Sequence, residues 1–178
     1  WCQYFFSCLL FLADSVSAMP GTHVVFAYGT LKRGFPNHFA MQQPPLLARC
    51  LGTATTATPY PLVIGTQYSI PFLLDVPGVG YHVAGEVWEV DDEMLQLMDE
   101  FEGVGNALYK RTWVDLRDFR PDPPIDVNIS RAWAYLRGEG GGKHTTTDLL
   151  QSPHLPEYTL ECTKAFVPRE KRTGPILG

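Results

Sequence analysis

The sequence predicts a single α+β domain built on a mixed or antiparallel sheet or barrel. Short apolar runs bounded by proline- and glycine-rich turns outnumber the helical patterns, and strands and helices do not alternate regularly. The 15 prolines and 16 glycines favour strands joined by tight turns over a helical bundle. The length of 178 residues suits one domain with a substantial core, and neither an internal repeat nor a second domain is recognisable.

Seven segments carry the strand patterns. We expect strands at residues 23–28, 47–58, 83–90, 109–116 and 131–136, and a short apolar piece at 62–64. Residues 109–116 alternate as a half-exposed strand would. The prolines in and around residues 69–74 indicate an irregular or edge segment. Short helices are expected at 35–43 and 158–166, a loop or short helix at 148–156, and a loop at 120–125.

Residues 91–103, DDEMLQLMDEFEG, form the clearest amphipathic helix. At about 100° per residue, one face collects the apolar side chains Met94, Leu97, Met98 and Phe101, with Leu95 at its edge. Asp91 or Asp92 can cap the N-terminus, and Gly103 suits a left-handed C-terminal stop.

Glu102 falls on this apolar face, between Met98 and Leu95, while Glu100 falls well away from it. Partial desolvation and the negative end of the helix dipole would both raise the pKa of an inward-facing carboxyl at this position. A carboxylate with a raised pKa can act as a general acid and base near neutral pH. The competing interpretation is that the helix frays at Phe101 and that Glu102 simply reaches water.

Composition and motifs exclude several other functions. The net charge of −5 without a basic stripe argues against nucleic acid, and the five histidines lack metal-ligand spacing. The glycine-rich run at 138–143 is not a phosphate loop, since Arg137 and His144 replace its first glycine and its Ser or Thr, and we expect a flexible linker. Cys50 and Cys162 read as ordinary thiols that could pair only in a secreted chain. Asn128 begins an N-glycosylation sequon, which would be used only if the chain is secreted.

The two ends of the chain differ from the body. Residues 1–18 resemble either a signal peptide without its basic start or an extension upstream of Met19, and we exclude them from the fold. Their apolar run is too short for a transmembrane helix. We expect the domain at 19–172 and a flexible tail at 173–178. The low charge makes a monomer without membrane partners the default expectation.

Taken together, several motifs resemble the γ-glutamylcyclotransferase-like (AIG2-like) family, and most closely its γ-glutamylamine cyclotransferases. The motifs are VVFAYGTLKRGFPNH at 24–38, PYPLVIG at 59–65, IPFLL at 70–74, GEVWEVDDEMLQLMDEFEG at 85–103, LYKR at 108–111 and PRE at 168–170. The resemblance implies a small mixed β-barrel flanked by helices (the BtrG-like fold), no cofactor and a cytoplasmic location. A true signal peptide at 1–18 would instead imply secretion.

The resemblance also implies a site and a reaction. Glu102 would be the catalytic acid/base, and residues 168–170 would form a closing segment. Substrate would be held by the backbone at Tyr28, Gly29, Thr30 and Leu31 and bordered by Ile70, Pro71 and Phe72. The reaction would be cyclising cleavage of a γ-glutamylamine, such as the γ-glutamyl-ε-lysine of transglutaminase crosslinks, to 5-oxoproline and a free amine. The alternatives are a γ-glutamyl amino acid or glutathione substrate, or a non-catalytic γ-glutamyl-binding homologue.

Overall fold

A closed five-stranded barrel forms the centre of the molecule. The computed structural model describes residues 21–124, 126–138 and 145–173. The barrel strands follow the order β1 (Thr22–Ala27), β5 (Ala84–Asp91), β2 (Ala48–Thr56), β6 (Tyr109–Pro121) and β7 (Arg131–Arg137). All neighbours are antiparallel except β1 and β7, which close the barrel in parallel where Val25 faces Trp133. The predicted α+β class with a mixed barrel is confirmed.

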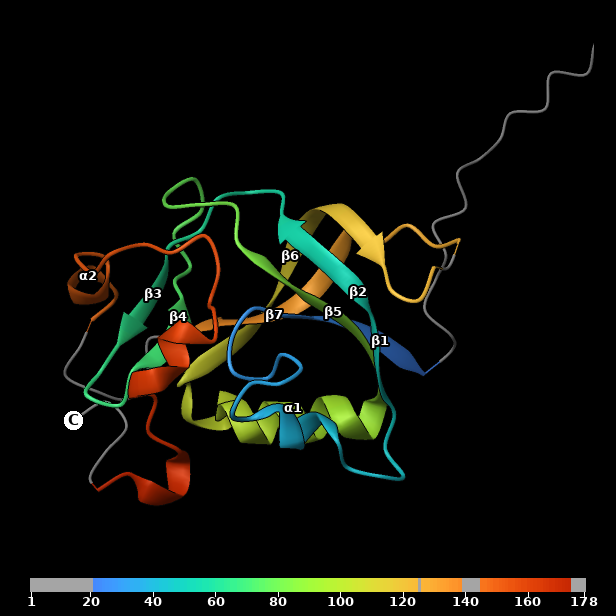
Figure 1. Ribbon diagram of the computed structural model, residues 1–178, viewed down its shortest axis with the longest axis horizontal. Helices are drawn as coiled ribbons and strands as arrows, with labels where there is room; N and C mark the ends of the chain where they lie inside the picture. Colours follow the sequence, from blue (N-terminus) through green and yellow to red (C-terminus); the bar gives the residue numbers. More distant parts are fainter. Residues whose placement is uncertain (1–20, 125, 139–144, 174–178) are drawn as a thin grey trace, which may run out of the picture.

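A separate two-stranded sheet lies beside the barrel (Figure 1). It pairs β3 (Leu62–Gly65) with β4 (Ile70–Leu73) in antiparallel register. Pro71 lacks a backbone N–H, and β4 has β3 as its one strand partner among the described residues. The segment predicted to be irregular or an edge is therefore an edge strand, and its position beside the barrel makes it available to line a site.

The predicted helix is α1 (Asp92–Glu102), which lies along one side of the barrel (Figure 1). The Asp91 side chain caps it by accepting a hydrogen bond from the Met94 N–H at 2.8 Å. Gly103 ends it with φ of 69°, a left-handed conformation that glycine adopts without steric cost. The buried face of α1 shares one hydrophobic cluster with residues of β1 and β5: Met94, Leu95, Met98, Val25, Trp88 and Val90.

The remaining helices are short: η1 (His38–Met41), η2 (Val104–Asn106), α2 (Thr146–Leu149), η3 (Glu161–Ala165) and η4 (Arg169–Lys171). The helices predicted at 35–43 and 158–166 are thus single 3-10 helices within those ranges. Pro44 and Pro168 follow them closely, and a proline disfavours helical backbone at the residue before it. α2 begins before the range 148–156, because Thr145 and Asp148 form a capping box.

Strand β6 is longer than predicted. It continues to Pro121, so the loop expected from residue 120 is wrong at its start. Pairing with β2 carries the strand onward, with Arg120 facing Thr53 and Pro121 facing Gly52. The expected alternation holds for residues 113–116, where Val114 and Leu116 are buried, but it reverses at the start, where Tyr109 is buried.

The remaining expectations concern the two cysteines, a membrane-spanning helix, the glycine-rich run and the two ends of the chain. Cys50 and Cys162 are both free thiols. No helix among the described residues is long and apolar enough to cross a membrane. Residues 1–18, most of the glycine-rich run at 138–143 and all but the first residue of the tail lie outside the described residues.

Candidate active site

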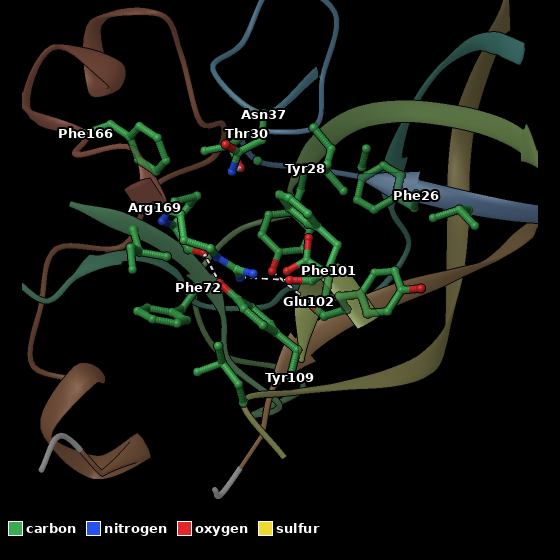
Figure 2. Close-up of a pocket in the computed structure, with 18 of the residues that line it drawn as sticks. Phe26, Tyr28, Thr30, Asn37, Phe72, Phe101, Glu102, Tyr109, Phe166 and Arg169 are labelled. Carbon is green, nitrogen blue, oxygen red and sulfur yellow. Dashed lines mark hydrogen bonds between the residues drawn. The ribbon is translucent and has the colours of Figure 1, made fainter. Parts of the chain in front are cut away.

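A cavity forms where the end of β1, strand β4, the C-terminal end of α1 and the segment around η4 meet (Figure 2). The cavity has a volume of about 60 Å³. This is room for several waters or a small polar headgroup. The structure brings together every residue that the sequence assigns to the site, and all of them line this cavity: Tyr28, Gly29, Thr30, Leu31, Ile70, Pro71, Phe72 and Glu102.

The turn after β1 presents unused backbone donors to the cavity. Within the described part of the chain, the N–H groups of Gly29, Thr30 and Leu31 donate no hydrogen bond. Asn37 fixes the turn, because its backbone N–H donates to the Thr30 carbonyl at 3.0 Å and its side-chain amide donates to Thr30 Oγ1 at 2.9 Å. Gly29 packs so closely on Pro71 that a Cβ there would lie 3.1 Å from Pro71 Cγ. Successive N–H groups of this kind can receive an anion or a polarised carbonyl.

Glu102 reaches the cavity from the last residue of α1. The helix does not fray before it, and the residue is half-buried. Its carboxyl accepts no hydrogen bond from any described residue. Burial raises the pKa of Glu102 from 4.5 to about 7, although the nearby Arg169 guanidinium works in the opposite direction. The group can therefore both accept and release a proton at neutral pH.

Asp99, one turn earlier in α1, is engaged in a network of its own. It accepts a hydrogen bond from the Tyr135 hydroxyl at 2.8 Å and pairs with Arg111 at 3.2 Å. These contacts give the Asp99 carboxyl a structural role between β6, β7 and α1. Of the two acids, Glu102 is the one left available to a ligand.

Two buried tyrosines hold strand β4 against the cavity. The Tyr28 hydroxyl donates to the Tyr135 carbonyl at 2.6 Å and accepts the Leu73 N–H at 3.3 Å. The Tyr109 hydroxyl donates to the Pro71 carbonyl at 3.1 Å. Burial raises the pKa of both phenols and the charge of Glu102 acts in the same direction, so both remain neutral donors. Both tyrosines therefore position the wall of the site.

The C-terminal segment supplies the remaining wall through Phe166, Arg169 and Arg172. Arg169 Nη2 donates to the Phe101 carbonyl at 2.8 Å, and the guanidinium packs 4.9 Å from the Phe101 ring centroid (Figure 2). This bond ties η4 to the C-terminal end of α1, next to Glu102. The segment at 168–170 therefore reaches the site that it was expected to close.

Sequence reasoning missed Asn37, Tyr109 and Arg172 as cavity residues. Asn37 and Tyr109 stand inside the quoted motifs, but one reads as a turn residue and the other as the start of a strand. Arg172 has no signal beyond its closeness to the PRE motif. Among the described residues there is no cluster of three or more His, Cys, Asp or Glu side chains that could hold a metal ion.

Comparison with known proteins identifies the family. The sequence model described as gamma-glutamyl cyclotransferase, AIG2-like, matches residues 25–157. The chain belongs to this family. It is 37% identical over 158 residues to the human protein named gamma-glutamylaminecyclotransferase, an alignment that covers 84% of this chain and 99% of the human one.

Other family members agree in sequence and in fold. The rat gamma-glutamylaminecyclotransferase is 48% identical over 94 residues, 52% of this chain, and the match spans 62% of the rat protein's length. A crystal structure of an AIG2-like protein from the mouse superposes with a TM-score of 0.71 at 33% identity, covering 85% of this chain and 99% of the mouse chain. The barrel and its helices are therefore the AIG2-like fold.

Proposed function

We propose that this protein cleaves γ-glutamylamines, such as γ-glutamyl-ε-lysine, by intramolecular cyclisation to 5-oxoproline and a free amine. It would be a carbon–nitrogen lyase that needs no cofactor. The observation that carries the proposal is Glu102: a carboxyl without a hydrogen-bond partner among the described residues, with a pKa of about 7, in the same cavity as three unused backbone donors. The names of the human and rat relatives support the same substrate class.

In this reaction the substrate carries its own nucleophile. The α-amine of the γ-glutamyl group attacks the γ-carbonyl carbon and closes a five-membered ring, and the bond to the leaving amine breaks. Holding the two groups in line is a proximity effect that can contribute roughly 7–11 kcal/mol in the best intramolecular cases. The close packing of Gly29 on Pro71 suits this task, since it fixes the turn that borders the cavity.

Glu102 would transfer the protons. As a carboxylate it takes a proton from the attacking α-amine, and as a carboxylic acid it gives that proton to the departing amine nitrogen. One group with a pKa near neutrality is sufficient for both steps, because each step regenerates the form that the other needs. The N–H groups of Gly29, Thr30 and Leu31 would be shared between the carboxylate of the γ-glutamyl headgroup and the negative charge that develops on the γ-carbonyl oxygen, the latter an effect of about 3–4 kcal/mol per donor in measured cases.

Two alternatives share the cavity. A γ-glutamyl amino acid or glutathione would use the same chemistry with a different leaving group. A non-catalytic homologue would keep the γ-glutamyl pocket without turnover. The retention of an inward, unengaged acid at Glu102 favours an enzyme, because a binding module gains nothing from burying a carboxylate next to its ligand's own carboxylate.

The test is a substrate panel with residues 19–178. We expect 5-oxoproline release from γ-glutamyl-ε-lysine to exceed release from γ-glutamyl-alanine and glutathione. Faster release from either of the latter would retain the mechanism and change the substrate class. Calorimetric binding of these compounds without release from any of them would support the binding module instead.

A further inference from the structure

Arg172 is a pre-oriented cation in the cavity wall that the chemical step leaves unused. Its Nε donates to the Val167 carbonyl at 2.9 Å. Its guanidinium carbon lies 5.6 Å from the Tyr68 ring centroid and 5.4 Å from that of Phe166. The hydrogen bond and the two rings fix the plane of the guanidinium, which reduces the entropy lost when it binds a planar anion.

The terminal nitrogens of Arg172 have no counter-ion among the described residues. They make no hydrogen bond and no ion pair there. Glu170 is near enough to favour the charged form, but burial and the neighbouring Arg169 outweigh it and lower the pKa of Arg172. A partly desolvated cation beside a second cation is stabilised by an anionic partner. An anionic group on a ligand would offset this cost.

Arg172 also lies farther from the reaction centre than Arg169 does. Arg169 is hydrogen-bonded to the Phe101 carbonyl, directly before Glu102, whereas Arg172 is hydrogen-bonded to the Val167 carbonyl and packs on Tyr68. An anion at Arg172 would therefore belong to a part of the substrate that is removed from the γ-carbonyl.

We propose that Arg172 binds the carboxylate of the leaving amine and so selects γ-glutamylamines whose amine carries a carboxylate, such as lysine. The inference rests on the proposed function. A guanidinium offers two parallel N–H donors to a carboxylate, which a single ammonium cannot match. Phe166, which packs on Arg172 and lines the same cavity, provides an apolar surface for the aliphatic chain between the amide and that carboxylate.

The carboxylate of the γ-glutamyl headgroup is the competing ligand. The headgroup must place its α-amine and γ-carbonyl at Glu102, which leaves its own carboxylate within a few bonds of the reaction centre. The unused N–H groups of residues 29–31 belong to the turn that lines the cavity and contacts Pro71. They suit the headgroup, and Arg172 remains for the distal group.

The experiment compares γ-glutamyl-ε-lysine with γ-glutamyl-cadaverine, which is the same molecule without the lysine carboxylate. We expect the wild-type kcat/KM to be about 10- to 100-fold higher for the lysine compound, the range for a hydrogen bond between charged groups. Arg172→Gln should abolish this preference by slowing the lysine compound alone. Arg172→Lys should retain a part of it, and Arg117→Gln, on an exposed strand residue, should leave it unchanged. Equal slowing of both compounds by Arg172→Gln would overturn the inference, as would a wild type without preference.

Binding separates this inference from the proposed function. Calorimetry with Glu102→Gln, alone and combined with Arg172→Gln, measures the affinity for both compounds without turnover. The same preference for the lysine compound should appear and should vanish in the double variant. If the wild type released no 5-oxoproline while this binding preference held, the proposed function would fail and the role of Arg172 would stand. Equal binding of the two compounds, or binding of neither, would refute the role of Arg172 whatever the catalytic result.

Discussion

Replacing Glu102 by Gln should stabilise the protein at neutral and alkaline pH. The substitution keeps the shape of the side chain and removes the charge. The carboxyl accepts no hydrogen bond from the described residues, so the amide has no protein contact of that kind to lose. The cost that the variant avoids is that of ionising a carboxyl in a partly desolvated cavity. The same feature that suits Glu102 to proton transfer should therefore reduce stability.

The size and pH dependence of the effect follow from the two pKa values. Below pH 4.5 the carboxyl is neutral in both the folded and the unfolded chain, so it costs nothing. Between pH 4.5 and about 7 the unfolded chain loses the proton first, and the free energy of unfolding of the wild type falls as pH rises. At ~1.4 kcal/mol per pH unit, the shift from 4.5 to about 7 corresponds to a full cost of about 3.5 kcal/mol, and partial solvent access reduces it to about 2–3 kcal/mol.

Urea unfolding of the wild type and Glu102→Gln at several pH values between 4 and 8.5 measures this difference. We expect nearly equal stability at pH 4, a growing advantage of the variant up to pH 7, and a constant advantage above it. For a chain of this size the plateau corresponds to roughly 5–10 °C in Tm. Glu100→Gln, an exposed position in the same helix, should show no such pH dependence. A difference that is absent at pH 8, or equal at pH 4 and pH 8, would refute the raised pKa.

Two further substitutions test the wall of the site. Tyr28→Phe should lower the free energy of unfolding by about 1–3 kcal/mol, because the Tyr135 carbonyl and the Leu73 N–H lose their buried partner. Urea unfolding measures this difference. Unchanged stability would show that the Tyr28 hydroxyl does not hold β4. Gly29→Ala should lower kcat/KM roughly tenfold or more in a folded protein, because the new Cβ must displace Pro71 or the turn with its N–H donors. A fully active Gly29→Ala variant would contradict the role of that turn.

Helix α1 could be predicted from the sequence almost completely, because its signals are local. Asp91 caps it, Gly103 ends it, and the spacing of Met94 and Met98 defines the buried face. The inward direction of Glu102 follows from the same spacing. The pKa of Glu102 could be predicted only in direction, since its value depends on groups such as Arg169 that arrive from a distant part of the chain.

The barrel order and the length of β6 could not be predicted in this way. β6 extends to Pro121 because β2 pairs with it, and that pairing joins segments about 65 residues apart, which leave no local pattern. Charged residues such as Arg117 and Arg120 conceal the strand, because its outer face is exposed to solvent. A strand that is identified by its apolar residues ends too early in such a case.

The position of Arg172 in the site could not be predicted from local sequence either. Its position depends on the fold of the C-terminal segment, where Tyr68 accepts the Val167 N–H at 3.0 Å and its hydroxyl donates to the Thr173 carbonyl at 2.8 Å. Neither contact has a sequence period or motif that reveals it. Glu102 and the turn after β1 lie in motifs that local sequence reveals, whereas Arg172 reaches the cavity only through the fold of the C-terminal segment.

The role of Glu102 in proton transfer is tested most directly by comparing 5-oxoproline release from γ-glutamyl-ε-lysine by the wild type, Glu102→Gln and Glu100→Gln. We expect Glu102→Gln to remain folded and to lose at least about 10²-fold in kcat, the lower range for removing a general acid and base. Glu100→Gln should keep the wild-type rate. Wild-type turnover by a folded Glu102→Gln variant would contradict the assignment of proton transfer to Glu102.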